Sequence, residues 1–308
     1  MFGKFVIGID LGGTNLKIAL LDLRYKIRDK ELLSTKEFIK KETLIYAIIN
    51  SINKIIQRNN LKRMNILGVG LGLPGPIDTE RGVVHFFPNI PGWKEVNLKS
   101  ILEKNLKLAV FLDNDAKMMC LAEHKLGAAV GARQAVCITL GTGVGGGIII
   151  NGSLYRGSNN ASGEIGHLPL NEKGPRCNCG GYACLEAYIG SNRILKEVRG
   201  LFKRDISLEE LSSKALKQDR KAMTIWLRVA KRLGIALAGV INLLNPDCIV
   251  IGGGIAGAGR ILFDKVRDTI RERAMPVQAR HVKVLKAKLG NDAGVIGAAI
   301  LVRRGVGR

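Results

Sequence analysis

The sequence contains one strand–turn–strand pattern twice. "FVIGID" (5–10) is rich in β-branched residues and is followed by the turn "LGGTN" and a second strand, "LKIALLDL". The same order returns about 130 residues later in "AVCITLGTGVGGGIIINGSLY" (135–155). Helical patterns separate and follow the two copies. We therefore predict an α/β protein of two similar lobes that face each other across a central cleft.

The remaining sequence alternates helix and strand patterns. Residues 43–60 carry isoleucines at spacings of three and four, which predicts an amphipathic helix. A long helix follows the second copy, with apolar residues from Trp226 to Leu244 along one side, and stops at Asn245-Pro246. The other predicted elements are strands that begin in 66–78, 108–116 and 248–259, and helices over 116–127 and 291–302.

Length and composition fit two globular lobes. The 308 residues exceed one comfortable core, and 46% of them are apolar while 24% are charged. We predict an N-terminal lobe of 1–115 plus 291–308 and a C-terminal lobe of 116–290. The best apolar run, 234–244, is half the roughly 20 residues that a membrane span needs. No export signal is recognisable, so we expect a cytoplasmic protein with no membrane partner.

The chain is strongly basic, with 48 Lys and Arg against 26 Asp and Glu and a net charge of +22. These positive residues are spread along the whole chain. They form no long basic block and no pattern interleaved with aromatic residues, so we do not predict nucleic-acid binding. We interpret the charge as a solvated basic surface or an adaptation to the interior of the host, and a general attraction of anionic ligands is the alternative.

Three glycine-rich turns each follow an apolar strand. Backbone N–H groups exposed at such turns form anion-binding concavities, and Thr14 and Thr142 each add a hydroxyl donor. The third turn, 252–254, has no side chains to obstruct a flat nucleoside ring. An ordinary hairpin turn is the alternative for any one of them alone. Neither the P-loop pattern nor the dinucleotide fingerprint occurs.

Two acidic positions follow predicted strands. Asp10 precedes the first glycine turn, where a carboxylate suits Mg²⁺ beside phosphate oxygens; the alternative is a turn-capping aspartate. Asn114 and Asp115 stand between a strand and a helix, where both residues would make good N-caps. The functional interpretation of Asp115 is a general base for phosphoryl transfer to a hydroxyl.

One histidine and three cysteines cluster in a short glycine-rich segment, 167–184. His167, Cys177, Cys179 and Cys184 have the spacing H-x9-C-x-C-x4-C, which suits a closed, structural Zn²⁺ site; reduced cysteines without metal are the alternative. Glu164 and Glu186 flank this segment. Carboxylates and imidazole are suited to binding vicinal hydroxyls, so we predict a polyol pocket held in shape by the metal.

The whole set of motifs resembles the ROK family of sugar kinases and repressors. They occur in the family's order: "DLGGTNLK" (10–17), "GLPGPID" (72–78), "NIPGW" (89–93), "DNDA" (113–116), "LGTGVGGG" (140–147), "GEIGH" (163–167), "CNCGGYACLEA" (177–187), "IVIGGG" (249–254) and "AGVIGAA" (293–299). The resemblance implies the duplicated, ribonuclease H-like, two-lobed actin/hexokinase-like ATPase fold. It also implies zinc in the Cys/His segment.

The resemblance implies transfer of the ATP γ-phosphate to a hexose 6-hydroxyl with Mg²⁺, glucose being the first candidate. N-acetylmannosamine, N-acetylglucosamine, mannose, allose and fructose stay open, as does the phosphoryl donor. Asp115 matches the base. The implied sugar contacts are Asn89, Asn114, Glu164, His167 and Glu186, and the implied nucleotide and phosphate contacts are Asp10, Gly12, Gly13, Thr14, Lys17, Thr142, Gly143, Gly253 and Gly254.

Three small residues depart from the family's pattern. The family commonly has Gly at Ala183, Ser at Gly190 and Ala or Gly at Ser162. The family also implies a homodimer or homotetramer. Its repressors carry a helix-turn-helix domain in front, and the first predicted strand here starts near Phe5, so we expect an enzyme rather than a sugar-responsive regulator.

Overall fold

The computed structural model describes residues 4–38, 40–87 and 92–307. They group into two compact units, each with its own sheet and core. Unit 1 consists of Met1–Lys125, Arg156–Ser162 and Asn291–Arg308, and unit 2 of Leu126–Tyr155 and Gly163–Gly290.

Unit 1 is built on a five-stranded sheet of order β3-β2-β1-β4-β8. β1 runs antiparallel to β2 and parallel to β4, which is in turn parallel to β8. The strands are β1 (Phe5–Leu11), β2 (Asn15–Asp22), β3 (Ile27–Ser34), β4 (Ile66–Leu73) and β8 (Val110–Asn114). A separate small sheet contains β5 (Ile77–Asp78), β6 (Val83–Phe86) and β7 (Lys94–Asn97).

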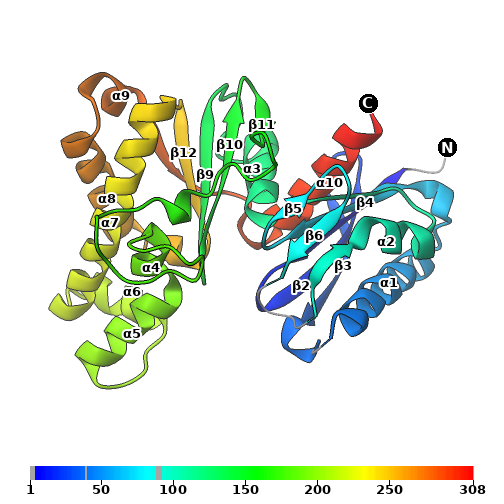
Figure 1. The fold of residues 1–308 in the computed structure, drawn as a ribbon, viewed down its shortest axis with the longest axis horizontal. Coiled ribbons are helices and arrows are strands. Elements are labelled where there is room, and N and C mark those ends of the chain that lie inside the picture. The colour runs from blue at the N-terminus through cyan, green and yellow to red at the C-terminus, as the bar shows by residue number, and fades with distance from the viewer. Residues whose placement is uncertain (1–3, 39, 88–91, 308) are drawn as a thin grey trace. The chain divides into compact units, whose positions relative to one another are not determined.

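Successive residues of β1 face opposite sides of the sheet, and different helices of unit 1 cover the two sides. Ile7 and Ile9 are fully buried in a core shared with α1 (Lys41–Arg58) and α2 (Leu98–Leu106). Gly8 points the other way, where a Cβ would overlap the backbone of α10 (Ala293–Val306). The closing helix α10 therefore lies directly against β1 and β4, next to strands from the start of the chain (Figure 1). The remaining α-helix of this unit is α3 (Asp115–Leu126).

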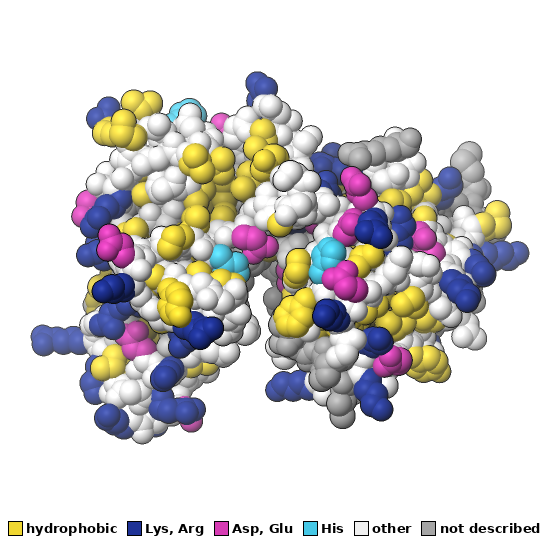
Figure 2. Space-filling model, viewed as in Figure 1, with side chains coloured by type: hydrophobic (Ala, Val, Ile, Leu, Met, Phe, Trp, Pro, Cys, Tyr) yellow, Lys and Arg dark blue, Asp and Glu magenta, His cyan; other side chains and the backbone are white. Residues whose placement is uncertain are grey.

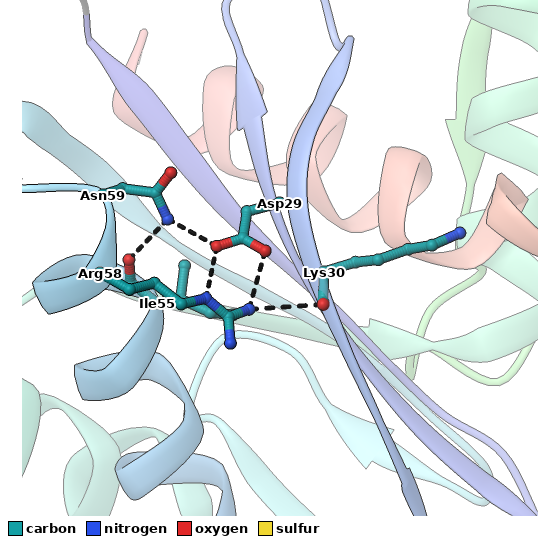
Figure 3. Close-up of polar contacts among 5 residues, drawn as sticks. All are labelled: Asp29, Lys30, Ile55, Arg58 and Asn59. Atoms are coloured by element: carbon teal, nitrogen blue, oxygen red, sulfur yellow. Dashed lines mark hydrogen bonds and ion pairs between the residues drawn. The ribbon is translucent and has the colours of Figure 1, made fainter.

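An ion pair fastens β3 to the end of α1. Asp29 accepts from Arg58 through both guanidinium positions, Nε to Oδ2 at 2.6 Å and Nη2 to Oδ1 at 2.8 Å. Asn59 Nδ2 donates to the same carboxylate at 2.6 Å and to Ile55 O at 2.8 Å (Figure 3). The Arg58 side chain is 43% exposed, so this ion pair is a surface contact between β3 and the end of α1.

Unit 2 repeats the sheet of unit 1. Its strand order, β11-β10-β9-β12-β13, matches β3-β2-β1-β4-β8 position by position, with antiparallel pairs at β9/β10 and β10/β11 and parallel pairs at β9/β12 and β12/β13. The strands are β9 (Ala135–Leu140), β10 (Val144–Ile150), β11 (Ser153–Tyr155), β12 (Cys248–Gly252) and β13 (Lys283–Lys286).

The helices of unit 2 pack around the long α7 (Arg220–Leu244). Trp226 is fully buried on α7 in the core that also contains Ile138 and Ile251 of the sheet. Asp219 caps the start of α7 by accepting from Ala222 N at 3.0 Å, and Asn245 ends it in the left-handed conformation before Pro246. The other helices are α4 (Leu185–Ile189), α5 (Ser191–Phe202), α6 (Leu208–Leu216), α8 (Arg260–Arg273) and α9 (Pro276–His281).

The predicted fold class, α/β with a duplicated pattern, is confirmed. Both strand–turn–strand copies form as β1/β2 and β9/β10, and the long helix ends at Asn245 as predicted. The lobe bounds predicted from the sequence, 1–115 plus 291–308 and 116–290, stay a prediction. They differ from the compact units in α3 and in 156–162, which both group with unit 1.

Positive side chains are dispersed on the face of each unit that Figure 2 shows. Figure 2 shows Lys and Arg side chains scattered among acidic and apolar ones on the visible face of each unit. Among the described residues, no helix has the length and apolar character that crossing a bilayer requires.

Candidate active site

The carboxyl ends of three parallel strands bring the acids of unit 1 to one sheet edge. Asp10 on β1 stands opposite Gly72 on β4, and Gly72 stands opposite Asp113 on β8. Asp115 begins the helix that follows β8. In open α/β sheets, ligands bind at this edge, so the sheet places Asp10 and Asp115 where chemistry on a ligand is expected.

Asp10 is a confined carboxylate. Its side chain is 19% exposed and lies 3.4 Å from Lys17 Nζ, which also donates to Asn291 O at 2.7 Å. Gly294, in the first turn of α10, lies so close that a Cβ there would overlap the Asp10 carboxyl group. Burial raises the pKa of Asp10 above its ordinary value of 3.8, and Lys17 opposes this rise.

The first glycine turn, between β1 and β2, is closed by local backbone bonds. Gly12 N–H donates to Asn15 O at 2.9 Å, while Thr35 donates through its hydroxyl to Gly13 O and through its N–H to Thr14 O. Gly13 and Thr14 are exposed. Because Thr35 binds the carbonyls of Gly13 and Thr14, the turn has a fixed shape at the edge where β1 ends, one residue after Asp10.

Asn114 and Asp115 both cap α3. Asn114 Oδ1 accepts from Ala116 N at 3.0 Å, and Asp115 Oδ1 accepts from the same N–H at 2.8 Å. The capping alternative raised by the sequence is therefore part of the structure. It does not remove the catalytic one, because a carboxylate has two oxygens and several acceptor positions. Capping also holds the Asp115 side chain at the helix start.

Asp113, the residue before this cap, was not among the predicted site residues. Its side chain is 1% exposed, and Oδ2 accepts from Arg156 Nε at 2.9 Å and Nη2 at 2.8 Å. The local sequence "DND" offers a signal for Asp113, but nothing local marks Arg156, which is 43 positions away. The predicted sugar contact Asn89 lies outside the described residues.

The second and third glycine turns meet at one edge of the sheet in unit 2. Thr142 and Gly143 connect β9 to β10, and Gly253 and Gly254 follow β12, the parallel neighbour of β9. Gly253 has φ +85° and passes so close to Leu140 that a Cβ would overlap its backbone. Three of these turn residues, Thr142, Gly253 and Gly254, are exposed. The two predicted nucleotide elements of unit 2 are thus neighbours.

His167, Cys177, Cys179 and Cys184 form one cluster in unit 2. Their ligand atoms all lie within 4.8 Å of one another. Cys179 and Cys184 Sγ are 3.7 Å apart, and Cys177 Sγ is 3.7 Å from His167 Nδ1. For Zn–S bonds of about 2.3 Å and Zn–N bonds of about 2.1 Å, a tetrahedron places two sulfurs about 3.8 Å apart and sulfur and nitrogen about 3.6 Å apart. The four residues fit a zinc ion.

The chemistry of this donor set also favours a cation. Burial is the largest cause that raises the pKa of the Cys177 and Cys184 thiols, that of Cys184 to about 12, with the neighbouring thiols adding to it at Cys184. The Gly181 N–H lowers the pKa of the Cys179 thiol. Three thiolates cannot share this space without a positive charge between them. Ala183 next to Cys184 has φ +54°, which explains why Gly is common there in the resembling family.

Glu186 joins this cluster to the second glycine turn. Its Oε2 accepts from Val144 N at 2.9 Å, and Oε1 lies 3.8 Å from Cys177 Sγ. A Cβ on Gly143 would stand 2.6 Å from Oε2, so only glycine leaves room for this contact. On the other side of the cluster, His167 turns Nε2 toward Glu164 Oε2 at 3.8 Å. Within unit 2, the predicted residues therefore form one connected group.

Two duplicated sheets, each with a glycine turn at its hairpin, define the class of this protein as an α/β protein of the actin/hexokinase-like fold. A family model, ROK family, matches residues 6–305. The chain belongs to the ROK family.

Curated relatives match over nearly the whole chain. A glucokinase of Halalkalibacterium halodurans is 36% identical, covering 99% of this chain and 96% of its own. A glucokinase of Thermotoga maritima is also 36% identical, covering 98% of both chains. A xylose repressor of Caldicellulosiruptor bescii is 30% identical and covers 96% of this chain but 77% of its own.

Solved structures are similar as well. A ROK hexokinase of Thermus thermophilus has a TM-score of 0.83 at 32% identity, covering 98% of this chain and 99% of its own. A ROK family glucokinase of Streptomyces griseus, in complex with glucose and AMPPNP, has a TM-score of 0.84 at 30% identity, covering 98% and 100%.

Proposed function

We propose that this protein is an ATP-dependent glucokinase that phosphorylates the 6-hydroxyl of glucose. The observation that carries the proposal is Asp115, a carboxylate held at the start of α3 on the same sheet edge as the Asp10 turn. Binding a sugar needs no base, whereas transferring a phosphoryl group to its hydroxyl does. The full-length similarity to two glucokinases supports glucose as the acceptor.

In the proposed reaction, Asp115 accepts the proton of the sugar 6-hydroxyl as its oxygen attacks the γ-phosphorus of ATP. The bond between that phosphorus and the β–γ bridging oxygen breaks, and ADP leaves. A general base contributes about 10²–10⁴ in rate. Positioning of the two substrates supplies much of the rest. Asn114, Glu164, His167 and Glu186 are proposed to orient the sugar, with Asn89 as a further contact from outside the described residues.

Phosphate binding is assigned to the turns. Gly12, Gly13 and Thr14 in unit 1 and Thr142 and Gly143 in unit 2 are proposed to donate to phosphate oxygens, and Gly253 and Gly254 to lie against the nucleoside. The AMPPNP in the S. griseus structure is an ATP analogue and supports ATP as donor. Mg²⁺, when bound, would offset phosphate charge. The confined Asp10 carboxylate supplies an oxygen ligand of the kind that Mg²⁺ prefers, and the Lys17 ammonium, 3.4 Å from it, is proposed to contact the nucleotide phosphates instead.

The Cys/His cluster is proposed to hold a structural zinc ion through all four residues. Such an ion, when bound, supplies no Lewis acid to the reaction because no coordination position is open. The chain's own residues do the rest. His167 keeps Nδ1 on the cluster and Nε2 on the side of Glu164, which fixes the edge of the ring that can meet a sugar. Removing zinc should abolish sugar phosphorylation and leave most helix content.

A coupled assay tests the proposal directly. Purified protein is given ATP, ADP or polyphosphate with glucose, mannose, allose, fructose, N-acetylglucosamine and N-acetylmannosamine. Glucose with ATP should give the highest kcat/KM. A higher value for another sugar would move the proposal to that kinase within the family, and no turnover with any pair would refute it.

A regulator is the second candidate, because the xylose repressor is 30% identical over 96% of this chain. A mobility-shift assay with DNA across a salt series separates the two. Sugar-dependent binding to specific DNA without turnover would favour the regulator. A homodimer or homotetramer remains a prediction from the family resemblance, and light scattering of the purified protein checks it.

A further inference from the structure

Segment 156–162 belongs to unit 1, although the chain on both sides of it belongs to unit 2. Three contacts hold it there. Arg156 pairs with Asp113 of β8, Lys117 Nζ of α3 donates to the Asn160 carbonyl, and Thr79 Oγ1 donates to Asn160 Oδ1 at 3.0 Å. Two of the three contacts therefore go to residues on either side of Asn114 and Asp115.

Both oxygens of the Asp113 carboxylate have partners. Oδ2 receives both guanidinium bonds from Arg156, and Oδ1 accepts from Asn114 N–H at 2.8 Å. A buried charge is costly unless it is paired, and this side chain is 1% exposed. The pair therefore fixes the peptide that enters Asn114 and Asp115.

Arg156 also fixes the exit from its own segment. Ser162 N–H donates to Arg156 O at 3.0 Å, which closes the segment on itself, and Gly157 turns the chain with φ +73°. The next residues along the chain are Gly163 and Glu164. Within unit 1, one ion pair thus anchors both the peptide before the proposed base and segment 156–162.

We propose that Asp113 and Arg156 are positioning residues for sugar phosphorylation. Neither touches a substrate. They set the place of Asp115 and of the neighbouring proposed sugar contact Asn114. This inference rests on the proposed kinase function. Loosening the pair lowers kcat, because base and hydroxyl must come within hydrogen-bond distance, and raises the sugar KM. The ATP KM stays unchanged, because the proposed nucleotide contacts lie outside segment 156–162.

The test compares two arginine–aspartate pairs of unit 1. Arg156→Ala should lower kcat by about 10- to 100-fold and raise the KM for glucose. Arg156→Lys, which keeps the charge but not the two-pronged geometry, should fall between it and the wild type. Arg58→Ala is the matched control. It removes the pair with Asp29, which also uses Nε and Nη2 of its arginine and holds no proposed site residue (Figure 3), and it should leave kcat and both KM values near wild type.

Two further measurements keep the outcomes distinct. Adding guanidinium ion to Arg156→Ala should recover part of kcat, which a merely structural loss would not allow. Hydrogen exchange, which needs no turnover, should rise at amides 113–117 and 157–165 in Arg156→Ala and not in Arg58→Ala. If Arg156→Ala does not fold, Asp113→Asn/Arg156→Gln takes its place, since it leaves no unpaired charge.

An active wild type with Arg156→Ala kinetics equal to Arg58→Ala would overturn the positioning role and leave the kinase intact. An inactive wild type would overturn the proposed function instead. Unchanged hydrogen exchange in Arg156→Ala would then overturn the anchor as well, on grounds independent of activity.

Discussion

Zinc binding to the metal-free protein should release protons, and their number follows from the cluster. Burial raises the thiol pKa of Cys177 above its ordinary 9.0 and that of Cys184 to about 12. Both thiols therefore carry protons at pH 7–8. The Gly181 N–H lowers the thiol pKa of Cys179, so this thiol loses its proton more readily than the other two. Since zinc binds thiolates, each ion should displace between two and three thiol protons.

This count sets the pH dependence of zinc affinity. Each displaced proton makes the apparent Kd fall about tenfold per pH unit, so two protons give about a hundredfold, or about 2.7 kcal/mol, between pH 7 and 8. The sign is tighter binding at higher pH. Calorimetric titration in two buffers of different ionisation enthalpy measures the released protons, and competition with a chelator measures the affinity.

Two variants sharpen the zinc experiment. Cys179→Ser should weaken binding and bring the released protons close to two. Cys120→Ala, which changes a buried thiol of α3 outside the cluster, should behave as wild type. Release of fewer than two protons, a stoichiometry other than one zinc per chain, or unaltered binding by Cys179→Ser would refute the four-ligand site.

Three further predictions test the carboxylates and the second glycine turn. Asp115→Asn should lower kcat by at least about 10² with little change in the glucose KM, and steady-state kinetics that keep kcat would remove Asp115 from the base role. Asp10 has a raised pKa in the folded state, so its stabilising contribution is present at low pH and is lost as pH rises from 3.8 through the raised value. Urea unfolding from pH 4 to 7 should show wild type losing stability relative to Asp10→Asn, and the opposite trend would contradict the burial argument. Gly143→Ala must displace the Glu186 carboxylate from Val144 N–H. The ATP KM should rise by about tenfold or more, whereas Gly141→Ala, whose Cβ meets nothing within 4 Å, should not change it.

Local patterns in the sequence predicted the parts of the fold that depend on neighbours in the chain. The apolar strands before each glycine turn form β1, β9 and β12, and isoleucines three and four residues apart form α1. The Cys/His cluster was predictable for the same reason, since its four ligands lie within 18 consecutive residues. β3, a charged strand at the edge of its sheet, was not predicted, because its side chains alternate without an apolar face.

The Asp113–Arg156 pair could not be predicted from local sequence patterns. Its partners are 43 positions apart, and they meet only because segment 156–162 returns to unit 1. The same limit applies to Glu186. Its chemistry suggested a sugar contact, but its bond to Val144 N–H depends on how α4 packs against the β9/β10 turn. Side chains that connect distant segments follow from tertiary packing, which spacing along the chain does not encode.

The route of the backbone has a consequence for how such a protein can be divided. Residues 126–155, 156–162, 163–290 and 291–308 belong alternately to unit 2 and unit 1, so the chain passes from one unit to the other four times. A single protease cut, or a gene truncated at any one point, therefore cannot yield a complete unit 1, and it yields a complete unit 2 only together with pieces of unit 1. Loss of the last 18 residues alone would strip α10 from the sheet that begins at Phe5. During synthesis, unit 1 can therefore be completed only after the ribosome has made α10.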